Sequence, residues 1–228
     1  MEIKPIAYIK NDFTEKFGIP RQSGLTGMVS KIIFEEEYRN REAFRGIEQY
    51  SHFWLIWNFS EVNSEKWSPT VRPPRLGGNT RMGVFATRSP FRPNHMGLSS
   101  VKLEKFEFDP VYGPVMYVSG ADIKNDTPIF DIKPYLPYTD CHPEAESGFS
   151  LSSTDAVLNV EYSDEAKKVI PSDKIDILTE ILEQDPRPQY QNEESRIYGF
   201  SFSDMEIKFT VTDDTLTVVS SEKRKMIL

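Results

Sequence analysis

The alternation of apolar and polar residues along the chain predicts a protein made mainly of β-strands. Residues 3–9 alternate, and residues 29–34 are rich in β-branched side chains, so both stretches favour strands. The segment 52–59, HFWLIWNF, is apolar on both faces, which is typical of a central strand buried on two sides. Further strands are expected over residues 82–86, 98–108 and 115–121.

Helical signals are sparse in the first 140 residues. The stretch 40–50 predicts one short helix with Asn40 as its N-cap. Glycines and a proline in FTEKFGIPRQSGLTG, residues 13–27, exclude a helix there and indicate an ordered loop or surface arm. Many strands without an alternating βα rhythm predict a closed or nearly closed β-barrel, because closure removes exposed strand edges.

The pattern changes near residue 140 and divides the chain. We expect the barrel over residues 1–140, a small, polar linker over 141–155, and a small α+β domain over 156–228. In the last part, Ile175, Leu178, Ile181 and Leu182 repeat at helical spacing. Strands are expected there over residues 157–160, 197–202, 205–212 and 216–221. About 70 residues are marginal alone, so this domain is expected to dock on the barrel.

Composition sets the compartment that we expect. The lone cysteine, Cys141, cannot form an intramolecular disulfide, which favours a reducing, cytoplasmic location. The N-terminal residues lack the pattern of a signal peptide. The longest apolar run, 53–59, is far shorter than the ~20 residues that cross a bilayer. We therefore expect no membrane segment.

Charge is distributed unevenly along the chain. The formal net charge is −8, yet residues 68–103 contain no Asp or Glu. The basic residues of this stretch are Arg72, Arg75, Arg81, Arg88, Arg92 and Lys102. Such a cluster is either a solvated face or, where shaped backbone accompanies it, a site for carboxylate or phosphate. Prolines 73 and 74 and glycines 77 and 78 favour the second interpretation, although any one arginine could instead pair with an acid elsewhere.

Several common sites are excluded by spacing. GGNTRMG does not match the dinucleotide-binding glycine pattern and precedes a strand, so a Rossmann site is unsupported. The three histidines are scattered, which argues against a metal site. The chain has no G-x-S-x-G motif, and its lone cysteine lies in the expected linker, so covalent catalysis is weakly supported.

Five motifs appear in a recognisable order: KFGIPRQSGL, HFWLIWNF, VRPPRLGGNTRMGVFATRSPFRPN, DTPIFDIKPYLPY and DPRPQY. Together they resemble the TrmO (TsaA-like) family of tRNA methyltransferases. The resemblance implies a cytoplasmic homodimer that uses S-adenosylmethionine to methylate the exocyclic nitrogen of N(6)-threonylcarbamoyladenosine next to the anticodon of tRNA. It also implies a β-barrel that binds the cofactor without a Rossmann fold, and a C-terminal domain that assists with tRNA.

The resemblance also carries over a set of cofactor contacts. They fall on Pro20, Arg21, Gln22, Arg88, Leu98, Ser119, Gly120, Ala121 and Asp122. Arg88 or Arg21 could hold the cofactor's carboxylate, and Asp122 could accept from its ammonium or from a ribose hydroxyl. The alternative for Asp122 is a turn acid that ends a strand.

Methyl transfer to a weakly nucleophilic nitrogen benefits from a base. Candidates in DTPIFDIKPYLPY are Asp126, Asp131, Lys133, Tyr135 and Tyr138, with Asp131 preferred and Tyr135 second. A purely structural strand and turn with an Asp/Lys pair is the competing interpretation.

Other residues are assigned to the anticodon stem-loop. Arg72, Arg75, Arg92 and Arg187 suit its phosphates, and Tyr190 could stack on a base. Residues 185–190 could equally form a helix-terminating turn that docks the two domains. The aromatic residues of HFWLIWNF are expected to be core.

The chain departs from the family pattern at three places. Ser60 stands where a histidine often ends the aromatic strand, His95-Met96 replaces Pro-Ile, and Asp126 replaces a glycine. The first weakens the carry-over of a cofactor contact at that position, and the other two flank the expected pocket and bear on which nucleoside is accepted. Two rival functions also stay open, an inactive tRNA-binding module and a regulatory protein that senses S-adenosylmethionine.

Overall fold

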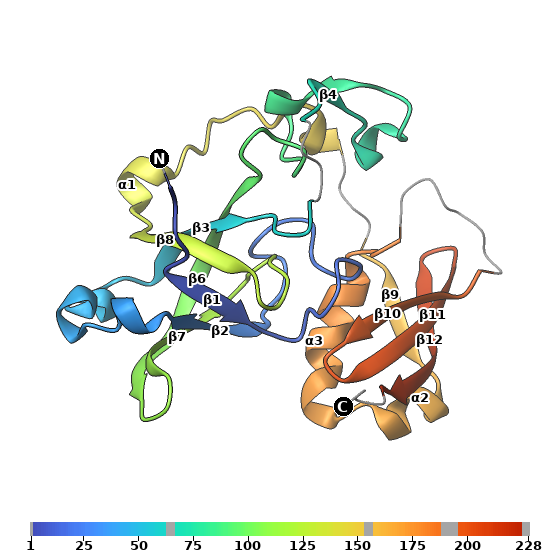
Figure 1. Cartoon of the computed structure of the whole chain (residues 1–228). Coiled ribbons are helices and arrows are strands. Elements are labelled where there is room, and N and C mark those ends of the chain that lie inside the picture. The colour runs from blue at the N-terminus through green and yellow to red at the C-terminus, as the bar shows by residue number, and fades with distance from the viewer. Residues whose placement is uncertain (1, 63–66, 153–156, 188–195, 225–228) are drawn as a thin grey trace.

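The computed structural model describes residues 2–62, 67–152, 157–187 and 196–224. Figure 1 shows two bodies, a barrel formed by the first part of the chain and a smaller sheet with helices formed by the last part. The expectation of a mainly β protein with a barrel and a small α+β domain is confirmed. Among the helices of the described residues, none is long and apolar enough to cross a membrane.

Six antiparallel strands close the barrel in the order β1-β2-β7-β6-β3-β8. They are β1 (Ala7–Lys10), β2 (Val29–Phe34), β3 (His52–Asn58), β6 (Met96–Asp109), β7 (Gly113–Ser119) and β8 (Pro128–Pro134). Because each strand has two neighbours, these six strands leave no open edge between them. Their inward side chains, such as Ile9, Ile32, Leu55 and Met116, form the first hydrophobic core.

The aromatic strand β3 is buried on one face only. Phe53, Leu55 and Trp57 point into the core, whereas Trp54 and Ile56 on the other face are half-buried. The expectation of burial on two sides is therefore wrong, because a barrel wall has one inner and one outer face. On the outer face, the Trp54 ring lies 5.4 Å from that of Tyr135, and its Nε1 donates to Asp140 at 2.9 Å.

A small flap follows β3. It pairs β4 (Thr70–Val71) with β5 (Met82–Gly83), and a 3-10 turn spans Pro74–Leu76 between them. The expected strand over 82–86 is wrong beyond Gly83, since residues Val84–Ala86 form a 3-10 turn. The N–H of Val84 binds the carbonyl of Pro69 at 3.0 Å, and the turn then redirects the chain.

The expected helix over 40–50 is replaced by short 3-10 turns. They span Glu36–Tyr38, Arg41–Phe44 and Ile47–Gln49. Asn40 caps the second turn as expected, because its side chain accepts from the N–H of Glu42. Gly46, with φ of 86°, interrupts the helical path and explains why no single helix forms.

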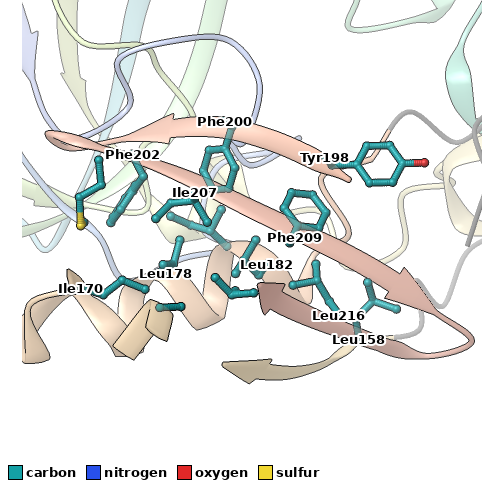
Figure 2. Packing of buried hydrophobic residues seen from close by; sticks show 14 of the residues in the cluster. Leu158, Ile170, Leu178, Leu182, Tyr198, Phe200, Phe202, Ile207, Phe209 and Leu216 are labelled. Atoms are coloured by element: carbon teal, nitrogen blue, oxygen red, sulfur yellow. The ribbon is translucent and has the colours of Figure 1, made fainter. Parts of the chain in front are cut away.

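The second body is a four-stranded sheet in the order β10-β11-β12-β9, with two helices against it. Its elements are β9 (Asn159–Tyr162), α2 (Asp164–Val169), α3 (Ser172–Glu183), β10 (Tyr198–Phe202), β11 (Met205–Thr212) and β12 (Thr215–Lys223). The expected helix and meander are present, and the sequence missed α2 and the parallel pairing of β9 with β12. Figure 2 shows Phe200, Phe202 and Phe209 packing over Leu178 and Leu182 of α3.

The N-terminal arm, residues 11–28, crosses from the barrel to this second core. Phe13 and Met28 are buried among the side chains of the C-terminal domain. The bodies are also tied by hydrogen bonds, since Glu180 accepts from the N–H of Gly27 at 2.6 Å and Lys174 pairs with Asp12. The boundaries expected at 140 and 156 stay a prediction. Short helical segments, α1 (Pro137–Asp140) and the turn Gly148–Ser152, lie near them.

Candidate functional site

A cavity of about 930 Å³ opens where the arm, β3, the segment after the flap and the start of β6 meet. Its size suits a ligand as large as a nucleoside conjugate. The predicted cofactor residues that line it are Pro20, Arg21, Gln22, Arg88, Leu98 and Asp122. Four separate segments of the sequence thus contribute to one hollow, as the motif-based prediction requires.

The arm forms one wall of the cavity. The N–H of Gly24 donates to the carbonyl of Gly120 at 2.8 Å, which holds the arm against the chain that follows β7. A Cβ at Gly120, where φ is 81°, would lie 3.2 Å from the backbone of Gly24, so a glycine permits this close approach. Gln22 is placed so that its Oε1 accepts from the guanidinium of Arg88. Arg88 itself is exposed.

Asp122 lines the cavity and is held by Ser99 of β6. The hydroxyl of Ser99 donates to Oδ1 of Asp122 at 2.5 Å, and Nε1 of Trp57 donates to the same hydroxyl oxygen at 2.9 Å. Burial raises the pKa of the Asp122 carboxyl above its ordinary value. The hydrogen bond from Ser99 and the charge of Arg88 act in the opposite direction.

An ion network forms another part of the wall. Glu61 pairs with Lys124 and lies 3.4 Å from Nζ of Lys16, and all three residues line the cavity. The hydrogen bond from Lys124, aided by Lys16, lowers the pKa of Glu61. The cavity therefore contains two carboxyl groups whose pKa values are displaced in opposite directions, upward by burial for Asp122 and downward by the ion pair for Glu61.

Three predicted cofactor residues lie next to the cavity without lining it. Ser119 donates from its hydroxyl to Glu104 at 2.6 Å, and Ala121 is buried in the barrel core. Gly120 contributes its carbonyl to the arm. The 119–122 motif therefore positions Asp122 more than it supplies a continuous contact surface.

The two predicted catalytic residues also lie outside the cavity lining. Asp131 on β8 pairs with Lys133 at 3.1 Å, which is the arrangement of the structural alternative. The Tyr135 ring lies 5.4 Å from the ring of Trp54, which does line the cavity. Desolvation, followed by the nearby Cys141 and Asp140, raises the pKa of Tyr135, so its phenol stays protonated near neutral pH.

The arginines assigned to tRNA are not gathered in one place. Arg72 is exposed beside a smaller hollow of about 340 Å³ with Gly77 and Gly78. Arg92 donates to the carbonyl of Thr87 at 2.7 Å and lines the main cavity. Arg187 is bound through two hydrogen bonds to Asp185 and its side chain is only 13% exposed. Tyr190 and the side chain of Arg75 lie outside the described residues.

Sequence reasoning missed several residues of the cavity. The motifs did not point to Glu61 and Lys124, which line the cavity, or to Ser99, which is buried and donates to Asp122. Trp57 belongs to the core as expected and also lines the cavity. Ser99 carried a usable signal, since a serine on the inward face of an otherwise apolar strand must find a partner when buried. Within the described residues, no group of three His, Cys, Asp or Glu side chains is placed to hold a metal.

Comparison with known proteins decides the family. Residues 8–141 match the tRNA-methyltransferase O N-terminal domain, and residues 155–224 match the TrmO C-terminal domain. The chain belongs to the TrmO family. The resemblance read from the five motifs is therefore confirmed.

Relatives in this family span nearly the full chain. The tRNA (adenine(37)-N6)-methyltransferase of Escherichia coli K12 is 37% identical, with 98% of both chains covered. A crystal structure of TrmO from Pseudomonas aeruginosa superimposes with a TM-score of 0.78 at 31% identity, covering 97% of this chain and 98% of that one. A probable S-adenosyl-L-methionine-binding protein of Pyrococcus abyssi is 31% identical over 64% of this chain and 74% of its own length.

Proposed function

We propose that this protein transfers a methyl group from S-adenosylmethionine to the N6 nitrogen of adenine 37 in tRNA, and that the accepted nucleoside is N(6)-threonylcarbamoyladenosine. One observation carries the proposal. Residues from four separate segments, Pro20 to Gln22, Arg88, Leu98 and Asp122, converge on one cavity of suitable size in a chain of the TrmO family. The full-length relative in Escherichia coli supports the position on adenine 37.

The donor set fits S-adenosylmethionine. This cofactor supplies a methyl group on a positively charged sulfonium, which makes the methyl group reactive without a metal. Arg88, exposed in the cavity, is suited to the carboxylate, because a guanidinium binds carboxylates with two parallel hydrogen bonds. Asp122 is suited to the ammonium or a ribose hydroxyl, and Pro20 and Leu98 supply apolar walls.

The residues act chiefly by holding and orienting the reactants. Reacting atoms about 3 to 3.5 Å apart and in line gain most of the rate that such a transfer needs. The ion network of Glu61 and Lys124 fixes one wall of the cavity, and the bond between Gln22 and Arg88 fixes another. Both reduce the rearrangement that binding requires.

We propose Asp131 and Tyr135 as the candidates for the group that interacts with the proton of the acceptor nitrogen. Because the phenol of Tyr135 stays protonated near neutral pH, it suits hydrogen-bond donation to the acceptor better than removal of its proton. We expect Tyr135→Phe to lower kcat more than it changes KM for tRNA. Asp131→Asn tests the base directly, and unchanged rates between about pH 6 and 9 would remove Asp131 from the mechanism.

RNA binding is assigned to the acid-free stretch of the flap. Arg92 lines the cavity and is suited to a phosphate near an adenine that enters it. Arg72 is exposed beside the smaller hollow of the flap and is assigned to another phosphate of the anticodon stem-loop. Arg75, Arg187 and Tyr190 keep their proposed roles at the anticodon stem-loop. For Arg187, contact with RNA requires that its ion pair with Asp185 opens.

We further propose that the protein is a homodimer and acts in the cytoplasm. Sedimentation that gives a single subunit at micromolar concentration would contradict the dimer.

The decisive experiment measures incorporation of labelled methyl from S-adenosylmethionine into tRNA from a strain that lacks its own enzyme. We expect incorporation with this tRNA and none with tRNA that also lacks the threonylcarbamoyl group. Arg88→Ala should reduce incorporation at least tenfold, since a charge-assisted contact is lost. Arg45→Ala, which removes an exposed arginine paired with Glu42, is the matched control and should leave it unchanged. Normal activity of Arg88→Ala would refute the assignment of Arg88.

The same assay separates the rival functions. A tRNA-binding module without turnover would bind tRNA in a salt-dependent manner but incorporate no label and bind no cofactor. A regulatory sensor would bind the cofactor and also incorporate none. Label in tRNA excludes both.

A further inference from the structure

A chain of hydrogen bonds runs through the barrel wall from Trp57 on β3, through Ser99 on β6, to Asp122 in the cavity. The nitrogen Nε1 of Trp57 lies 2.9 Å from the hydroxyl oxygen of Ser99, which lies 2.5 Å from Oδ1 of Asp122. Trp57 is 6% exposed and Ser99 is 1% exposed, so water has little access to either group. Ser99 has no role in the motif-based assignment of cofactor residues, and Trp57 was expected there only as part of the core.

The direction of both hydrogen bonds follows from chemistry. An indole N–H can only donate, so the oxygen of Ser99 must accept from Trp57. The single hydroxyl proton of Ser99 is then left to donate to Asp122. Oδ1 of Asp122 is thereby fixed as an acceptor, and the carboxylate cannot rotate without leaving a buried hydroxyl unpaired.

Gly97 makes this chain geometrically possible. Trp57 and Gly97 are directly paired in the register of β3 and β6. A Cβ at Gly97 would lie 2.3 to 2.7 Å from atoms of the indole ring, so any larger residue would push the ring away. The glycine lets the indole lie across β6 and reach Ser99, two residues further along the strand. Gly97 at the start of β6 thus has a specific packing role.

We propose that Trp57 and Ser99 are positioning residues that fix the orientation of the Asp122 carboxylate toward the cofactor in the cavity. The inference rests on the proposed function, because it assumes that Asp122 contacts the cofactor. Neither Trp57 nor Ser99 needs to touch the transferred methyl group. Their effect is to hold one oxygen of Asp122 inside the wall and leave the other, Oδ2, for the ligand.

The effect of Ser99 and Trp57 on Asp122 can be measured through the pH dependence of cofactor binding. The charged side chains that line the cavity besides Asp122 are Lys16, Arg21, Glu61, Arg88, Arg92 and Lys124. The pKa of Glu61 is lowered chiefly by its hydrogen bond from Lys124, whereas burial raises that of Asp122, so the two pKa values are displaced in opposite directions. Ser99 counteracts the effect of burial on Asp122. Removing its hydroxyl therefore moves the pKa of Asp122 further upward.

The test is calorimetric titration with S-adenosylhomocysteine, which keeps the carboxylate, ammonium and ribose, from about pH 5 to pH 8. Affinity should fall on the acid side of this range as Asp122 becomes protonated, and we call this part of the curve of affinity against pH the acid limb. Ser99→Ala should weaken binding about tenfold near the acid limb, equivalent to about 1.4 kcal/mol. It should also move that limb upward by about half to one pH unit. Trp57→Phe should shift the limb in the same direction by less, because the hydroxyl remains but is no longer oriented.

Two further variants isolate the hydroxyl. Ser99→Thr keeps it and should retain the wild-type acid limb. Ser30→Ala removes an equally buried serine hydroxyl of the same barrel, one that accepts from Asn11 and is not bonded to Asp122, and should change nothing. A shifted limb in Ser99→Thr or Ser30→Ala would show that the effect is general loosening of the barrel and would overturn the proposal.

The failure of this inference is distinct from failure of the proposed function. Absence of binding by the wild-type protein contradicts the proposed function. Tight wild-type binding with an unmoved acid limb in both Ser99→Ala and Trp57→Phe leaves the cofactor site intact and overturns the positioning role. Trp57→Phe keeps a ring in the core, so it supplies the answer even where Ser99→Ala does not fold.

Discussion

The guanidinium of Arg21 donates a 2.9 Å hydrogen bond to the carbonyl oxygen of Asp185, 164 positions away. It also reaches the carbonyl of Arg187 at 3.4 Å. Arg21 thus joins the N-terminal arm to the turn that follows α3. Because Nη2 of Arg21 is engaged in these hydrogen bonds, Arg88 is the better candidate for the cofactor's carboxylate.

Replacing each arginine by methionine should separate these two roles. Arg21→Met should lower the free energy of unfolding by about 1.5 to 3 kcal/mol, because two charge-assisted hydrogen bonds to the turn are lost. Arg88→Met should leave stability within about 0.5 kcal/mol, since its side chain is exposed. Urea denaturation followed by circular dichroism measures both. Cofactor binding that fails in Arg21→Met but persists in Arg88→Met would reverse the assignment.

Gly18 lies in the arm with φ of 88° against the ring of Phe200. A Cβ there would come within 2.4 Å of the ring, so Gly18→Ala should combine backbone strain with overpacking and destabilise by about 3 kcal/mol or more. Gly24→Ala is the matched control, because its φ is 82° but no atom lies within 4 Å. It should cost about 1 to 2 kcal/mol. Equal losses in the two variants, measured by thermal unfolding, would contradict the packing argument.

Asp126, which replaces a glycine of the family pattern, has φ of 64°. Aspartate tolerates this left-handed conformation better than branched residues do. Asp126→Gly should therefore change stability by less than about 0.5 kcal/mol, since its ion pair with Lys10 is exposed and contributes little. Asp126→Val should destabilise by about 1 to 2 kcal/mol. Chemical denaturation checks both values, and a tolerated valine would show that the turn adopts another shape.

Asp122→Asn should make the protein without cofactor more stable at neutral pH. The native pKa of Asp122 is raised by burial, so the native state binds more protons than the unfolded state just above the ordinary pKa of aspartate. Wild-type stability consequently falls as pH rises through the native pKa, and the asparagine variant avoids this loss. The advantage should disappear below about pH 4, where the wild-type carboxyl is protonated in both states. Stability curves against pH test this, and a variant that is less stable at pH 7 contradicts it.

The same variant should bind S-adenosylhomocysteine more weakly. An amide can still accept from Ser99, so the wall of the cavity keeps its shape, but it carries no negative charge for an ammonium group. Greater stability combined with weaker binding would identify Asp122 as a residue kept for function at a cost in stability. Affinity equal to that of the wild type would remove the ammonium contact from the proposal.

The sequence alone determined the barrel, the small C-terminal α+β domain, most of their strands and the family. Alternation along a strand and helical spacing over residues such as Leu178 and Ile181 are local signals, so they survive without knowledge of the fold. The motifs also identified the cavity residues Gln22, Arg88 and Asp122, because their spacing is specific to the family. The left-handed backbone at Asp126, where the family pattern has a glycine, was seen only in the structure.

Only the tertiary structure decided which side chains are free to act. Arg21 and Arg88 are equal candidates for the cofactor's carboxylate in the sequence, but a contact with the distant turn at Asp185 engages Arg21, whereas Arg88 is exposed in the cavity beside Gln22. Arg187 is held by its near neighbour Asp185. Trp57 looked like core, and its hydrogen bond to Ser99 depends on the pairing of β3 with β6 at Gly97. Such partnerships follow from register and long-range packing, and a hydrogen bond between residues far apart in the chain has no local pattern from which it can be predicted.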